Sequence, residues 1–154
     1  MDDSKREGLL KAYRATRYVI GPHAVTGGEE RELRVGALHP ALDAVLEERG
    51  HREWAFLTAW NPGSHPRDKN ENQRAQDQLL SQLIAGGWQV AAAVGQSEDG
   101  NWSEPSFFVP GLCRAEAERF GRAYGQVAVL VGRVGGLAEL LFCDGEDTRP
   151  AAAP

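Results

Sequence analysis

The fold class is decided by residues 54–60, which read Trp54-Ala55-Phe56-Leu57-Thr58-Ala59-Trp60. Side chains along a β-strand alternate between the two faces of a sheet, and in this stretch both alternating sets are largely apolar. A strand of this kind must be covered on both faces, which indicates a sheet packed between helices. The turn residues Asn61-Pro62-Gly63-Ser64 then end the strand.

The segments on either side of this strand alternate between helical and extended patterns. Apolar residues recur at helical spacing in residues 6–13, 40–49, 70–85 and 114–124, and the last three segments are each followed by glycine. Strands are predicted at residues 16–20, 32–35, 88–94, 106–109, 127–131 and 137–142. We expect the first two to pair as an edge hairpin and the next two to be central. The order predicts a single α/β domain with a mixed central sheet of about six or seven strands and helices packed on it.

Composition places the chain among ordinary globular proteins. It has 154 residues, of which 42% are hydrophobic and 25% charged. We expect residues 1–143 to form the single α/β domain and residues 144–154, which are acidic and contain alanine and proline, to be a disordered tail. No apolar run approaches the roughly 20 residues that a membrane helix needs, and the N-terminus is polar. The sequence therefore predicts a soluble, cytoplasmic protein.

Several function classes find no support in the sequence. A net charge of -5 argues against nonspecific nucleic-acid binding, which needs a surplus of lysine and arginine. The two cysteines, Cys113 and Cys143, lack metal or disulfide-scaffold spacing and favour a reducing compartment. The glycines of residues 132–136 precede a strand, as in a hairpin turn, and lack the Lys-Ser/Thr of a phosphate loop. The histidines also lack metal-ligand spacing, so we expect no metal and no cofactor.

The strongest candidate functional site is the segment 60–72. It leaves a buried strand and opens a helix, which is where open α/β sheets bind ligands and where free backbone N–H groups favour anions. Counting back from Leu83 and Leu79 in helical steps reaches Gln76 and Asn72, so Asn72 should face inward. A buried amide needs hydrogen-bond partners, because an unsatisfied one costs about 1–3 kcal/mol.

Two interpretations of this polar cluster stay open. In the first, the cluster joins the next apolar strand around a pocket for a small anionic or nucleotide-like ligand, with Glu104 as the acid/base candidate and Glu71 as its potential partner. The predicted ligand-binding residues are Asn61, Ser64, Asn72, Trp102 and Ser106. In the second, the cluster only braces the loop, and the protein is a noncatalytic module that binds a partner protein through Trp88 or Trp102. Whether the protein is an enzyme stays open.

Several short motifs, taken in their order and spacing, resemble a known family. They are Ala12-Tyr13-Arg14-Ala15-Thr16-Arg17-Tyr18, Thr58-Ala59-Trp60-Asn61-Pro62-Gly63-Ser64, Glu71-Asn72, Trp102-Ser103-Glu104-Pro105-Ser106-Phe107 and Tyr124-Gly125-Gln126. Together they resemble an uncharacterised bacterial family, domain of unknown function 3293, over about residues 13–131. The resemblance implies a small, cytoplasmic bacterial protein and carries no activity. Val127 departs from the polar residue that is more usual after Gly125-Gln126, so the resemblance assigns no role to Gln126.

Overall fold

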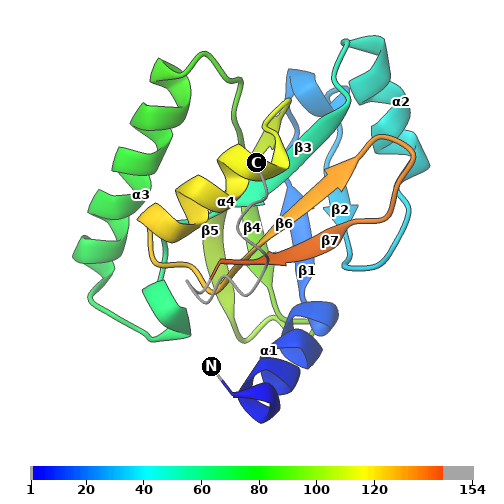
Figure 1. Cartoon of the computed structure of the whole chain (residues 1–154). Helices are drawn as coiled ribbons and strands as arrows, with labels where there is room; N and C mark the ends of the chain where they lie inside the picture. The colour runs from blue at the N-terminus through cyan, green and yellow to red at the C-terminus, as the bar shows by residue number, and fades with distance from the viewer. Residues whose placement is uncertain (1, 144–154) are drawn as a thin grey trace.

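The chain folds around a curled sheet of seven strands (Figure 1). A computed structural model describes residues 2–143, so the predicted disordered tail, residues 144–154, lies outside the described residues. The strands are β1 (Arg17–Ile20), β2 (Arg31–Leu33), β3 (Glu53–Leu57), β4 (Ala91–Gln96), β5 (Ser103–Pro110), β6 (Ala128–Arg133) and β7 (Glu139–Phe142). Their order across the sheet is β2-β1-β4-β5-β3-β6-β7.

Every pair of neighbouring strands is antiparallel. The α/β class, the edge hairpin of β1 and β2 and the central position of β4 and β5 are confirmed, whereas the mixed sheet is corrected to an antiparallel one. The hydrophobic pattern of a strand reports which faces are covered and not which way its neighbour runs. In this fold the helices connect strands that are not adjacent in the sheet, so they build no parallel pair.

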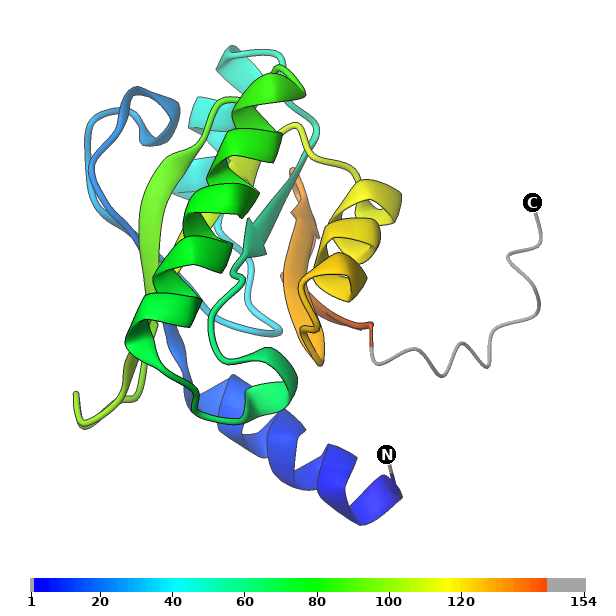
Figure 2. The ribbon, with the colours of Figure 1, turned by 90° about the vertical axis from the view of Figure 1, so that its left-hand side faces the viewer.

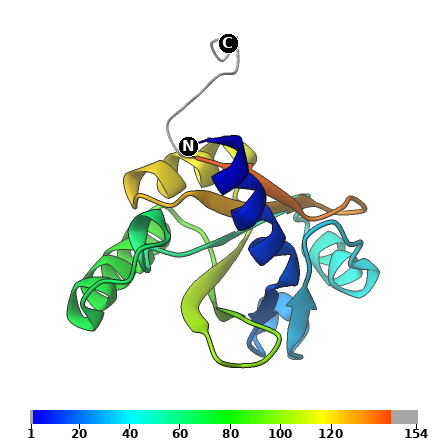
Figure 3. The same ribbon diagram turned by 90° about the horizontal axis from the view of Figure 1, so that it is seen from below.

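Helices cover the outer face of the curl and close one of its ends (Figure 2). They are α1 (Asp3–Ala15), α2 (Pro40–Glu48), α3 (Lys69–Ala85) and α4 (Arg114–Ala123), with short 3-10 turns η1 (Ala24–Thr26) and η2 (Pro62–Ser64). Helices α3 and α4 pack on the outer face, and α2 packs against the interior side. Helix α1 has no buried residue and projects from the end opposite to α2 (Figure 1). Seen from that end, α1 crosses in front of the sheet (Figure 3).

Alternation along β3 supplies both cores. Ala55 and Leu57 point to the core beneath α3 and α4, whereas Trp54 and Phe56 point into the interior of the curl. Phe56 meets Tyr18 of β1 with ring centroids 5.1 Å apart, although β4 and β5 lie between the two strands in the sheet. Side chains so far apart along a sheet touch only if the sheet bends strongly, so this contact records the curl.

The two edges of the sheet meet at the far side of the curl. After β2, the Gly36 N–H donates to the Ala138 carbonyl at 2.8 Å, and the Ala138 N–H donates to the Ala37 carbonyl at 3.0 Å, just before β7. These bonds satisfy backbone groups that a free edge would leave exposed. Within residues 2–143, neither Cys113 nor Cys143 forms a disulfide bond. Within residues 2–143, no helix is long and apolar enough to cross a membrane.

Candidate functional site

Asn72 of α3 is buried among partners from the loop that follows β3. It is 1% exposed, and its Oδ1 accepts hydrogen bonds from the Asn61 N–H at 2.8 Å and from Arg67 Nε at 2.6 Å. Its Nδ2 donates to Asn61 Oδ1 at 2.7 Å. The inward orientation predicted from the helical register is confirmed. The contacts are those of a residue that holds the loop in place.

Gln76, one helical turn further along α3, joins two strands that have separated. The pairing of β3 with β5 ends at Leu57 and Phe107. Beyond that point Gln76 Oε1 accepts from the Ala59 N–H at 2.8 Å, and Gln76 Nε2 donates to the Pro105 carbonyl at 3.1 Å. Because proline has no N–H, the β3–β5 ladder lacks a hydrogen-bond donor at Pro105. The Gln76 side-chain amide bridges the two strands at this position instead. We call Asn72 and Gln76 the amide clamp.

The loop that the amide clamp holds has an uncommon backbone conformation. Asn61 and Ser64 have φ values of 46° and 64°, in the left-handed region that costs a non-glycine residue about 1–2 kcal/mol. The Gly63 N–H donates to the Gly125 carbonyl at 2.8 Å, so the turn before β6 holds the loop from the other side. A strained loop persists only where the surrounding structure fixes it, and here two separate elements do so.

On the interior side of the same segment lies a cavity of about 170 Å³. It sits at the end of the curl from which α1 projects. Polar or aromatic side chains line it from several elements: Tyr13, Thr16, Tyr18, Thr58, Asn61, Ser64, Trp102, Glu104, Ser106 and Gln126. Its apolar part includes Phe56, Ala128, Leu130 and Leu140. Five of the predicted site residues thus share one cavity, while Asn72 lies outside it. We call it the Glu104 cavity.

One wall of the Glu104 cavity is a row of residues that pair across three strands. Tyr18 of β1 pairs with Gly95 of β4, which in turn pairs with Glu104 of β5. A Cβ added at Gly95 would lie 3.8–4.0 Å from side-chain atoms of Thr16, Tyr18 and Trp102. The missing side chain at this position therefore leaves the space that the cavity occupies between the aromatic rings and the carboxyl group.

The electrostatics of the cavity depend on Glu104. Burial raises the pKa of its carboxyl group from 4.5 to about 7, so this group is near half ionisation at neutral pH. No ion pair or hydrogen bond to that carboxyl occurs within residues 2–143. Burial also raises the pKa of Tyr13 and of Tyr18, and the Glu104 charge adds to both effects, while a hydrogen bond with Ser64 opposes the shift at Tyr13. The phenols therefore stay protonated where Glu104 exchanges its proton.

Other residues considered from the sequence lie outside this cavity. Glu71 is exposed on α3, so the structure does not bring it together with Glu104 as an acid/base pair. The start of α3, which begins at Lys69 after Asp68, is likewise outside the cavity lining. Trp88 is half-buried against Phe120, with ring centroids 6.0 Å apart. Trp102, in contrast, is 44% exposed at the rim of the cavity.

Sequence reasoning did not find several residues of the lining. Tyr13 and Tyr18 lie more than 80 positions before Glu104 in the chain, and only the family motif at residues 12–18 drew attention to them. Gln126, to which the resemblance assigned no role, donates from Nε2 to the Trp60 carbonyl at 3.1 Å and so holds the start of the loop. From the sequence alone, a polar residue next to a glycine turn does not indicate a role. Only the fold shows that Gln126 lies beside the loop after β3.

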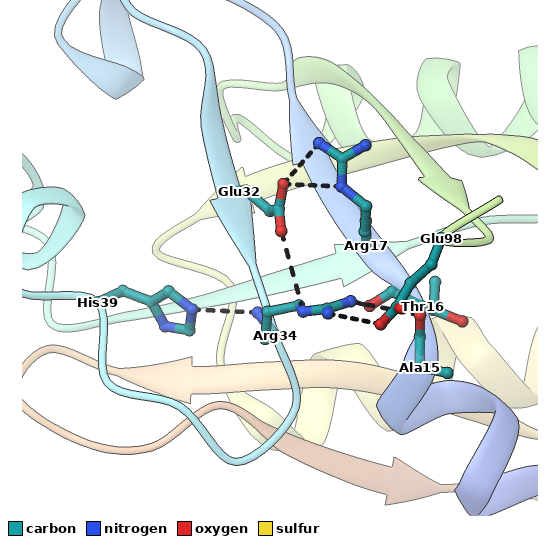
Figure 4. A network of polar contacts seen from close by, with 7 residues as sticks. All are labelled: Ala15, Thr16, Arg17, Glu32, Arg34, His39 and Glu98. Atoms are coloured by element: carbon teal, nitrogen blue, oxygen red, sulfur yellow. Dashed lines mark hydrogen bonds and ion pairs between the residues drawn. The ribbon is translucent and has the colours of Figure 1, made fainter. Parts of the chain in front are cut away.

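A network of surface charges ties the elements of the rim together (Figure 4). The Arg34 guanidinium donates to the carbonyls of Ala15 at 3.3 Å and Thr16 at 3.1 Å, where α1 ends. It also pairs with Glu98 at 2.7 Å, in the turn between β4 and β5 that carries Trp102. The network therefore links the end of α1, which presents Tyr13, to the turn that presents Trp102.

Fold and site together define a single-domain α/β protein with a polar cavity inside a curled antiparallel sheet. A family model described as "Protein of unknown function (DUF3293)" matches residues 57–129, which supports the family predicted from the motifs. The matched segment runs from the end of β3 into β6 and holds the amide clamp together with Glu104 and Gly95. The comparisons with curated proteins and with solved structures gave no match.

Proposed function

We propose that this protein is a small-molecule-binding domain and that the Glu104 cavity is its binding site. The observation that carries the proposal is a half-buried carboxyl group in a cavity, partly desolvated and without a hydrogen-bond or ion-pair partner among residues 2–143. Structural carboxyl groups gain hydrogen bonds or counter-charges when they are taken out of water, because burial alone is unfavourable. A carboxyl that keeps this unfavourable environment and faces a cavity is a candidate for ligand binding.

The size of the cavity bounds the ligand. An engineered cavity of roughly 150 Å³ binds benzene, so about 170 Å³ suits a molecule with one ring. A complete nucleotide is larger. In addition, no lysine, arginine or histidine lines the cavity within the described part of the chain. We therefore propose a ligand smaller than the nucleotide-like one expected from the sequence, and one that is not anionic.

The rigidity of the surroundings supports the same proposal. The amide clamp and Gln126 hold the backbone from Thr58 to Asn61, and the Gln76 amide also fixes Pro105, the neighbour of Glu104. A pre-organised site loses little conformational entropy when a ligand binds. If the domain is also an enzyme, Glu104 is the proposed acid/base residue, since its pKa of about 7 suits proton transfer at neutral pH.

A partner-binding surface is the competing proposal. Leu38 and Leu137 are 58% and 52% exposed, and the backbone bonds between Gly36, Ala37 and Ala138 bring their segments together. Trp102 adds an exposed aromatic ring at a separate place, beside the Glu104 cavity. This second proposal needs neither the cavity nor the Glu104 carboxyl, so variants of the cavity separate the two.

The experiment is a thermal-shift screen of one-ring metabolites against the parent protein and two variants of Gly95. A ligand that binds only the native state raises its stability. Gly95→Ala places only a Cβ at ordinary contact distance, whereas the larger Gly95→Val side chain extends into the cavity. We expect compounds that stabilise the parent and Gly95→Ala and do not stabilise Gly95→Val. A screen in which no compound stabilises the parent would contradict the proposal.

A further inference from the structure

We propose that the Glu104 cavity selects ligands that carry a primary ammonium group on a single ring. This inference rests on the proposed function and adds the chemical class of the ligand. Its basis is the combination of one unpaired carboxyl group with several aromatic side chains and several hydroxyl groups, in a lining that holds no basic residue among those described.

The charge of Glu104 favours a cationic ligand. When Glu104 is ionised, its carboxylate is a negative charge in a poorly solvated place, and the protein supplies no positive partner to it from residues 2–143. An ammonium group brought by the ligand would complete a charge-assisted hydrogen bond, the strong type. A carboxylate or phosphate on the ligand would instead be repelled by Glu104. The lining thus discriminates by the sign of the ligand charge.

The hydrogen-bond acceptors of the cavity suit an ammonium group. An ammonium group has three N–H donors and no acceptor, so its site needs acceptors. Beside the Glu104 carboxylate, the cavity offers the hydroxyl oxygens of Tyr13, Ser64 and Ser106. The Ser106 hydroxyl already donates to the Glu104 carbonyl at 3.1 Å, which directs its proton away and leaves its lone pairs for an incoming donor.

The aromatic side chains of the cavity suit both a cation and a ligand ring. Tyr13, Tyr18, Phe56 and Trp102 all line the cavity, and Tyr18 and Phe56 are in edge contact at 5.1 Å. Aromatic faces attract cations, most strongly where water is excluded, and they also pack against a ligand ring. The same four side chains can therefore favour both the charge and the ring of the proposed ligand.

The test compares three ligands of nearly equal shape by isothermal titration calorimetry. Benzylamine carries the ammonium, benzyl alcohol is its neutral analogue, and benzoate is an anion on the same ring. We expect benzylamine to bind at least about tenfold more tightly than benzyl alcohol, and benzoate to show no binding. Equal or tighter binding of benzyl alcohol, or binding of benzoate, would overturn the inference.

Two matched variants assign the selectivity to Glu104. Glu104→Gln keeps the shape of the side chain and removes its charge, and Glu71→Gln makes the same change on the exposed surface of α3. We expect Glu104→Gln to lose about tenfold in benzylamine affinity while benzyl alcohol is unaffected, and Glu71→Gln to match the parent. Unchanged benzylamine affinity in Glu104→Gln would overturn the inference even if the parent binds benzylamine.

The screen with Gly95→Val separates the failure of this inference from the failure of the proposed function. If the compounds that stabilise the parent and not Gly95→Val are neutral or anionic, the ammonium inference fails and the binding site stands. If no compound, including benzylamine, stabilises the parent, the binding site fails and the inference fails with it. Stabilisation by one-ring amines that is abolished in Gly95→Val and weakened in Glu104→Gln supports both.

Discussion

The two sides of the chain between Thr58 and Ser64 contrast sharply. On the α3 side, the amide clamp is buried and every polar contact is made within the protein. On the interior side, Glu104 is half-buried, and its carboxyl has no partner among the described residues. The contrast teaches that burial of a polar group does not reveal its role. Whether its partners are present in the fold separates a bracing group from a candidate binding group.

The largest effect is expected on the α3 side, from Gln76→Leu. The substitution leaves the Ala59 N–H unsatisfied, at about 1–3 kcal/mol. It also removes one of the two donors to the Pro105 carbonyl, at about 1 kcal/mol, while the Thr58 hydroxyl still donates to that carbonyl at 2.8 Å, so we expect the free energy of unfolding to fall by up to about 4 kcal/mol. Urea denaturation measures it. Gln78→Leu, on the exposed face of the same helix, is the matched control and should change stability by less than about 0.5 kcal/mol. Equal effects of the two variants would remove the contrast.

On the interior side, Glu104→Gln is expected to have the opposite sign. The pKa of Glu104 is about 7 in the folded protein and 4.5 without burial, so the folded state holds the proton longer as pH rises. Between these values the parent loses about 1.36 kcal/mol of stability per pH unit, and above pH 7 the loss is complete at about 3 kcal/mol.

Glu104→Gln has no ionisable carboxyl group at this position, so it does not lose this stability as the pH rises. We therefore expect Glu104→Gln to be more stable than the parent by up to about 3 kcal/mol at pH 8 and equal to it at pH 4, in urea denaturation at both values. Glu71→Gln, whose carboxyl is exposed, serves as the control. A Glu104→Gln variant that is less stable than the parent at pH 8 would show that the carboxylate has a partner in the fold.

The same contrast shows how much of the fold and of the candidate site could be predicted from the sequence. The helical register turned Asn72 and Gln76 inward, because helix geometry is local, and apolar runs located the strands for the same reason. The order and direction of the strands were not predictable, since pairing partners depend on contacts far apart in the chain. For that reason Asn72 and Glu104 were predicted to share one site, although the fold places them on opposite sides of the segment from Thr58 to Ser64. Tyr18 was not predicted as a site residue.

The strained loop offers a smaller test of the same contrast. Ser64 and Asn61 both have positive φ, and glycine would relieve the strain at either position by about 1 kcal/mol. Ser64→Gly also removes the hydrogen bond with Tyr13, so we expect the relieved strain to be offset and the free energy of unfolding to stay nearly unchanged. Asn61→Gly should lower it, because Asn61 also accepts from Asn72. Urea denaturation of both variants measures the difference, and a gain in stability for Asn61→Gly would argue that Asn72 does not brace the loop.

The smallest effect is expected at the rim. Arg17 pairs with Glu32 at 2.7 Å on the surface, where solvent and salt screen such pairs and they contribute little to stability. Glu32→Gln should reduce stability slightly at low salt and by much less at about 1 M salt, where the screening length is short. Thermal denaturation at the two salt concentrations measures the difference. An effect that is insensitive to salt would indicate a role for Glu32 other than this ion pair.

The proposed binding site depends most on Glu104 being a partly desolvated carboxyl group without a partner. Its pKa can be measured in the folded parent protein by ¹³C NMR of the side-chain carboxyl across a pH titration. We predict a value of about 7, which should fall when benzylamine is bound because an ammonium partner favours the ionised form. A pKa near 4.5 in the free protein would contradict the central claim, since it would mean that water or a protein donor already satisfies the carboxylate.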